Sequence, residues 1–115
     1  MRPIPLKMRN EMSNDPFYQR CCVTGKASGK IDFHHNLIFA GRQVNEKFCI
    51  LPLSREIHDR VHEEPFKGIV DWIMLNRASE DELTMFSKAR SLRFERDRLN
   101  RELGIWRENK YVDIR

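Results

Sequence analysis

The sequence predicts a small α+β domain of 115 residues, in which two short strands precede a series of helices. Residues 31–35 alternate apolar and polar side chains, as a half-buried strand does. The apolar run FCIL at 48–51 indicates a second strand, which Pro52 is expected to end. Helix-capping residues then recur along the rest of the chain, which favours helices after the strands.

The chain before the first strand is predicted to be an N-terminal arm, residues 1–20. Its stretch LKMRNEM at 6–12 can form a short helix, and the turn signal SNDP at 13–16 would end that helix. Residues 21–30 are rich in turn formers, and a loop at 37–47 joins the two predicted strands. The arm therefore leads into a β-β-α core at 21–63.

Three helices are expected after the second strand. Ser54 can cap a helix at 55–63, and a second helix follows Pro65 at 66–78. Ser79 and Glu82 form a capping box, which begins a long third helix at 80–103. The whole chain is therefore predicted to be a single domain, whose core at 21–63 is followed by a helical extension at 64–115 with two additional helices.

The charge favours an anionic partner, because the formal net charge is +4 and the excess lies in the first half. Residues 1–47 carry eight Lys and Arg against four Asp and Glu. Such a basic segment suits nucleic acid. Three cysteines, two of them adjacent, are a poor basis for disulfides, so a reducing, cytoplasmic setting is expected. No apolar run approaches the ~20 residues that span a bilayer, so no membrane partner is expected.

All four histidines lie in two clusters, HH at 34–35 and HDRVH at 58–62. His58 and His62 are four residues apart on a predicted helix, which places both imidazoles on one face. With His34 they offer three nitrogens to a metal ion and leave a position open, as a catalytic site requires. His35 would then be available as a general base near neutral pH.

The stretch DFHHN…GRQVNEKFCILPLSREIHDRVH resembles the HNH endonucleases of the ββα-metal (His-Me finger) type, with the colicin-like double histidine and H-x3-H. C-x-x-G at 22–25 and LPLS before the histidine helix are similar to phage and prophage members. The resemblance covers residues 21–63. It implies metal-dependent hydrolysis of DNA phosphodiester bonds with one divalent ion, magnesium being expected for turnover and zinc, nickel or manganese being alternatives.

The resemblance also implies roles for individual residues. His35 would be the general base, and His34, His58 and His62 would hold the metal, although some members use the last position for phosphate. The family asparagine commonly sits nine residues before the helix histidine, where this chain has Cys49. Either Asn45 in a shifted register or the Cys49 backbone carbonyl would orient His35, and Asn45 is preferred. The candidates to hold backbone phosphates are Arg42, Lys47, Arg55 and Arg60.

Two other functions stay open. One cysteine and two or three histidines could make a closed zinc site, and the protein would then be a nucleic-acid-binding module without catalysis. The helix at 80–103 interleaves arginines with acidic residues, which predicts a solvated, salt-bridged face. That helix could also join a protein partner or a second copy of the chain, in which case the protein would be an adaptor.

Overall fold

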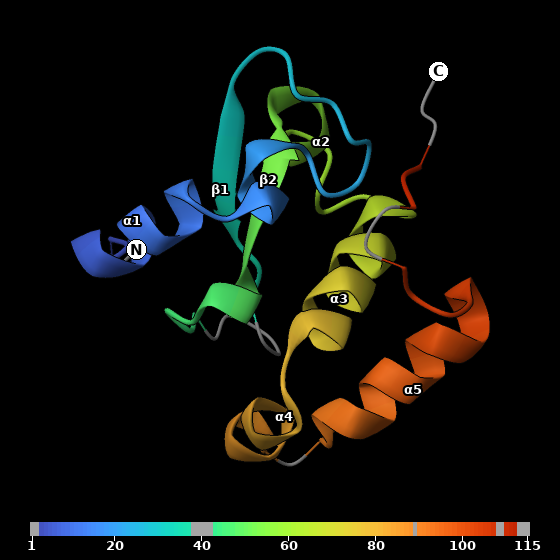
Figure 1. The fold of residues 1–115 in the computed structure, drawn as a ribbon. Coiled ribbons are helices and arrows are strands. Elements are labelled where there is room, and N and C mark those ends of the chain that lie inside the picture. Colours follow the sequence, from blue (N-terminus) through green and yellow to red (C-terminus); the bar gives the residue numbers. More distant parts are fainter. Residues whose placement is uncertain (1–2, 38–42, 89, 108–109, 113–115) are drawn as a thin grey trace.

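The computed structural model describes residues 3–37, 43–88, 90–107 and 110–112. These residues form an α+β fold with a two-stranded antiparallel sheet, as predicted. Figure 1 shows the sheet, α1 and α2 toward one end of the molecule and α4 and α5 at the other. The elements are α1 (Leu6–Ser13), the 3₁₀ turn η1 (Pro16–Gln19), β1 (Ile31–His35), the 3₁₀ turn η2 (Lys47–Cys49), β2 (Ile50–Ser54), α2 (Arg55–His58), α3 (Phe66–Arg77), α4 (Glu80–Phe86) and α5 (Leu92–Leu103).

The first strand lies where it is predicted, whereas the second begins later than expected. β1 pairs with β2 from Ile31 opposite Ser54 to His35 opposite Ile50. The residues just before β2 form the turn η2, in which the Cys49 N–H donates to the Glu46 carbonyl. Pro52 does not end the strand, because a proline without an N–H is tolerated where one edge of the strand has no ladder partner.

The histidine-bearing helix is shorter than the predicted helix at 55–63. Ser54 caps it as expected, with its hydroxyl accepting from the Ile57 N–H, but α2 ends at His58. Beyond that point Arg60 and Glu63 donate to carbonyls three residues back, which winds the chain into tighter turns. His62 therefore lies in a turn after the helix and not on it.

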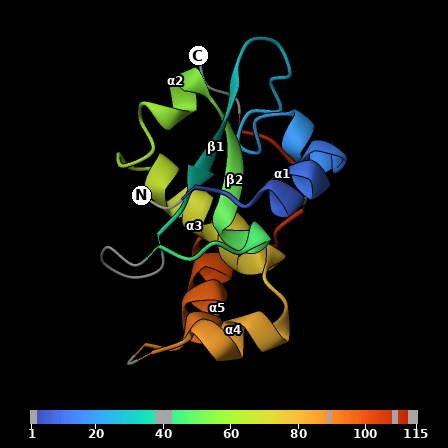
Figure 2. The same ribbon diagram turned by 90° about the vertical axis from the view of Figure 1, so that its left-hand side faces the viewer.

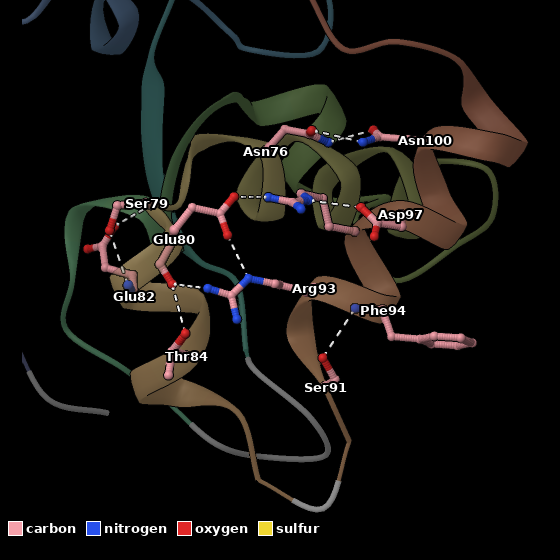
Figure 3. Close-up of polar contacts among 11 residues, drawn as sticks. Asn76, Ser79, Glu80, Glu82, Thr84, Ser91, Arg93, Phe94, Asp97 and Asn100 are labelled. Carbon is pink, nitrogen blue, oxygen red and sulfur yellow. Dashed lines mark hydrogen bonds and ion pairs between the residues drawn. The ribbon is translucent and has the colours of Figure 1, made fainter.

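The long C-terminal helix predicted at 80–103 is wrong as a single element, since the described chain forms α4 and α5 there. The capping box of Ser79 and Glu82 begins α4 as predicted (Figure 3). Ser87 donates to the Leu83 carbonyl and accepts from the Leu92 N–H, and Ser91 caps α5. These local side-chain hydrogen bonds compete with helical ones and separate the two helices. With α3, three helices rather than two follow the sheet and α2 in the part of the chain that the structure describes.

The larger apolar cluster joins β2 to the helices that follow it. It includes Leu51, Ile57, Val70, Leu83 and Leu99, so one core links the sheet to α5. None of the helices in the described ranges is long and apolar enough to cross a bilayer.

A second, smaller apolar cluster holds the segment that is predicted to be an arm. Met12, Tyr18 and Ile50 are its buried members, and Phe33 packs against them. The Tyr18 hydroxyl also donates to the Lys47 carbonyl over 2.7 Å. Figure 2 shows that α1 and α2 lie on opposite sides of the sheet. The two faces of β1 therefore have different neighbours.

Candidate functional site

The structure brings together the three histidines that are predicted to hold a metal. His34 is the fourth residue of β1, His58 ends α2, and His62 lies in the turn that follows. The His34 ring centre lies 5.1 Å from that of His58 and 6.4 Å from that of His62. The strand–helix junction at Ser54 makes this possible, because it folds α2 back beside β1.

His34 is held in the neutral form. Burial is the main cause that lowers its pKa to about 4, and the neighbouring charge of His58 lowers it further. A side-chain hydrogen bond with Asn36 opposes these effects but does not reverse them. A neutral imidazole keeps the nitrogen lone pair that a metal ligand needs.

A largely buried carboxylate orients His58. The Nδ1 of His58 lies 2.9 Å from Oδ2 of Asp32, whose side chain is only 10% exposed. The other carboxylate oxygen of Asp32 accepts from the Arg55 guanidinium over 3.3 Å. Nδ1 is thereby engaged and Nε2 of His58 is left for another partner, an arrangement common behind metal-bound histidines.

The spacing of these rings tests whether they suit a metal ion. With metal–nitrogen distances near 2.0–2.1 Å, two imidazoles on one tetrahedral ion have ring centres about 5 Å apart. The separation of His34 and His58 matches this value, whereas His62 lies farther away. As they stand, no three His, Cys, Asp or Glu side chains in the described chain could together hold a metal ion. His62 is exposed, so a change of rotamer is open to it. The spacing of two rings thus suits one ion, and a third ligand requires that movement.

His35 has a different partner. Its Nε2 lies 2.8 Å from Oδ1 of Asn45, so the ring nitrogen donates and Nδ1 is left as the basic atom. The Asn45 amide group in turn donates to the Pro3 carbonyl over 3.0 Å. The alternative partner, the Cys49 carbonyl, accepts from the backbone N–H of Asn36 instead. Of the two alternatives, the structure brings the Asn45 side chain to His35.

The contacts of β1 follow the alternation of a strand. Asp32 and His34 meet histidines of the α2 segment. Phe33 meets α1 and η1 instead, through Arg9 at 5.7 Å and Tyr18 at 5.8 Å between group centres. His35 lies on the Phe33 side and lines a cleft between β1 and α1. The two adjacent histidines therefore lie in different surroundings, His34 beside the α2 segment and His35 beside α1.

Each residue predicted to bind phosphate that the structure describes has a carboxylate nearby. Lys47 pairs with Glu11 at 3.1 Å, and Arg55 pairs with Asp32. Arg60 lies 3.9 Å from Glu63. Arg42 lies outside the described residues. The charges of the three described candidates are thus at least partly compensated within the protein.

Asn36 is a structural residue of the site that the sequence analysis does not identify. It is only 4% exposed, and its amide group donates to Asp71 of α3 over 2.8 Å. Asp71 also accepts from Lys67, one helical turn earlier. Asn36 thereby connects the end of β1 to α3. The signal in the sequence is an amide residue directly after two histidines, but its partner lies 35 positions away and is set by the fold.

Comparison of the chain with protein-family models, curated proteins and solved structures finds no match. Function is therefore inferred from the residues themselves and from their geometry.

Proposed function

We propose that this chain is a metal-dependent endonuclease of the HNH, ββα-metal type, which hydrolyses phosphodiester bonds of DNA. The observation that carries the proposal is the hydrogen bond of 2.8 Å between His35 and Asn45, next to the cluster of His34, His58 and His62. An oriented general base, and imidazoles that could hold a divalent ion, are together able to promote the hydrolysis of a phosphodiester.

His35 acts as the general base. With Nε2 donating to Asn45, Nδ1 takes a proton from a water molecule. The water oxygen then attacks phosphorus in line with the leaving 3′ oxygen. Asn45 keeps the ring in one tautomer and orientation, so the base does not have to reorganise during the reaction.

His34, His58 and His62 would hold the divalent ion. When bound, such an ion supplies stabilisation of the negative charge that develops on the phosphate and the leaving oxygen. Asp32 fixes the orientation of His58, and burial keeps His34 neutral. Both rings are therefore in a state that can bind a metal ion before the ion arrives.

The base and the metal ligands must reach one phosphate group although they belong to different faces of β1. β1 has one edge that does not pair with β2, and His34 and His35 lie at the end of that strand. His34 and His35 are neighbours in the sequence at the end of β1, so their Cα atoms are only about 3.8 Å apart although their side chains face opposite sides. A phosphate at the strand end would have both rings beside it.

The positions of the cysteines favour this proposal over a closed zinc site. Cys21, Cys22 and Cys49 are all buried, and they belong to the larger apolar cluster. We therefore place the histidines in an open site and the cysteines in the core.

The proposal is tested with supercoiled plasmid and purified protein in magnesium, manganese, nickel or zinc, with a chelator control. We expect metal-dependent cleavage, and a loss of about 100-fold or more in His35→Ala, because general-base catalysis typically contributes at least that much. His35→Ala should still bind metal. Equal cleavage by both proteins would contradict the assignment of His35. Tight metal binding without cleavage by either protein would indicate the zinc-stabilised binding module.

A further inference from the structure

A cleft of about 630 Å³ lies between α1 and β1. Figure 2 shows that α1 lies on the side of the sheet opposite α2. Pro3, Ile4, Arg9 and Ser13 line one side of it. The other side is formed by β1 and the residue before it, from Lys30 to Phe33, together with His35. The proposed general base is thus part of the wall of an open cleft.

The cleft carries two uncompensated positive charges. Arg9 and Lys30 are exposed, and no carboxylate in the described ranges lies within ion-pair distance of either. Asp32 also lines the cleft, but its two oxygens are engaged by Arg55 and His58. Arg9 and Lys30 differ in this respect from the residues predicted to bind phosphate. Each of those residues that the structure describes has a carboxylate partner.

The position of Arg9 relative to His35 is set by the packing of α1. The Arg9 guanidinium lies over the ring of Phe33, and Phe33 is on the same face of β1 as His35. Two residues of strand span about 6.6 Å, so the cation is held within a short distance of the base. Buried Met12 and the ion pair of Glu11 with Lys47 anchor the helix that carries Arg9.

We propose that this cleft binds the sugar–phosphate backbone of the substrate strand, and that Arg9 and Lys30 contact the phosphates beside the scissile one. The inference rests on the proposed function, because it takes His35 to act at a phosphodiester. It adds a binding surface that the N-terminal segment forms together with Lys30 and β1 of the β-β-α core. The recognition is of charge and is independent of base sequence.

The test is binding of fluorescent DNA, followed by anisotropy, in the His35→Ala background with chelator present. We compare the full chain with Arg9→Gln/Lys30→Gln and with a matched control, Lys7→Gln. Lys7 is on the same helix and carries the same charge, but it does not line the cleft. The double variant should bind at least tenfold more weakly, and the slope of log K against log salt should fall by about 2 for two lost phosphate contacts. Lys7→Gln should stay within twofold of the parent.

Cleavage assays separate failure of this inference from failure of the proposed function. Two exposed substitutions should leave the thermal unfolding midpoint unchanged, which is checked first. If the parent with His35 cleaves plasmid and Arg9→Gln/Lys30→Gln raises KM with little change in kcat, both stand. If cleavage and binding are the same with and without the two cations, the cleft is not the binding surface, although the nuclease proposal survives. If the parent never cleaves but the double variant alone loses DNA binding, the cleft binds backbone and the catalytic proposal fails. Absence of DNA binding by the parent overturns the inference.

Discussion

The polar groups at the end of β1 and those between α4 and α5 differ in burial. His34, His35 and Asn36 are buried, with exposures of 8%, 9% and 4%. The charged groups that join α4 to α5 lie largely at the surface, where Glu80 pairs with Arg93 (Figure 3). Glu80 also pairs with Arg96. The salt-bridged face predicted for this part of the chain is confirmed.

The two groups of polar residues have different roles: those at the end of β1 position side chains, whereas the ion pairs hold α4 against α5. A buried polar group is costly unless it is hydrogen-bonded, so each group at the end of β1 is held by a specific partner such as Asn45 or Asp71. Exposed ion pairs contribute little individually, and each can be replaced by water. We therefore expect substitutions at the end of β1 to affect the proposed chemistry, whereas at α4 and α5 stability should depend on buried apolar residues and only slightly on the exposed ion pairs.

The largest expected effect on chemistry follows His58→Ala. Removing one of the two well-spaced imidazoles should weaken metal binding and lower the rate of plasmid cleavage by about 1,000-fold, equivalent to about 4 kcal/mol of lost transition-state stabilisation. The increase in thermal midpoint that zinc gives the parent should disappear as well.

The matched control for this change is Asp59→Ala, which alters the next residue along the chain, exposed and with no histidine contact in the described structure. It should keep both cleavage and the zinc-dependent midpoint. A His58→Ala protein that cleaves at the parental rate would remove this histidine from the site.

The largest expected effect on stability lies in the other region. Leu83 is the fully buried residue of α4, so Leu83→Ala should lower the free energy of unfolding by about 3 kcal/mol in urea titration. Met85 on the same helix is 69% exposed, and Met85→Ala should change the free energy of unfolding by less than about 0.5 kcal/mol. Below their unfolding transitions both variants should cleave plasmid at the parental rate. A large loss of cleavage in folded Leu83→Ala would contradict the separation of chemical effects at β1 from stability effects at α4.

The sequence predicts well those elements whose signals are local. β1 follows from alternation over five residues, and the start of α4 follows from a capping box of four. The long helix at 80–103 fails because periodicity continues across Ser87 and Ser91, whose side chains close different hydrogen bonds in the folded chain. Whether a serine caps or continues a helix depends on tertiary packing as well as on its neighbours.

The same distinction applies to the candidate site. Histidine spacing indicates which imidazoles gather, and Asn45 is preferred from its position in the loop. The face of β1 that each histidine serves depends on α1, whose packing against the sheet is a long-range event. Asn36 with Asp71, and the cleft with Arg9, are therefore visible only once the chain is folded.

An intermediate effect is expected where the positioning of His35 alone is weakened. Asn45→Ala removes the acceptor of its Nε2 hydrogen and should lower kcat by about 10- to 100-fold, with metal affinity unchanged. Asn45→Asp keeps an acceptor and should recover part of the rate, with the acidic limb of the pH–rate profile shifted to higher pH, because a carboxylate favours imidazolium and His35 must be deprotonated to act as the base. A parental kcat in Asn45→Ala would mean that the contact has no part in catalysis.

The smallest effect is expected at the exposed ion pairs of the second region. Hydrogen bonds from Arg96 and then Arg93 lower the pKa of Glu80, so the folded state binds a proton at this site less readily than the unfolded state. The stabilisation is therefore fully present above the unfolded glutamate pKa, and it is lost as the pH falls through the lower pKa of the folded state. Glu80→Gln should be slightly less stable than the parent at pH 7, and the two urea midpoints should converge as the pH falls below about 4.3. Raising the salt concentration at pH 7 should also narrow the gap, since exposed charges are screened. A gap that stays constant across both titrations would show that Glu80 acts through packing or capping, and the adhesion between α4 and α5 would then have to be assigned to their apolar contacts.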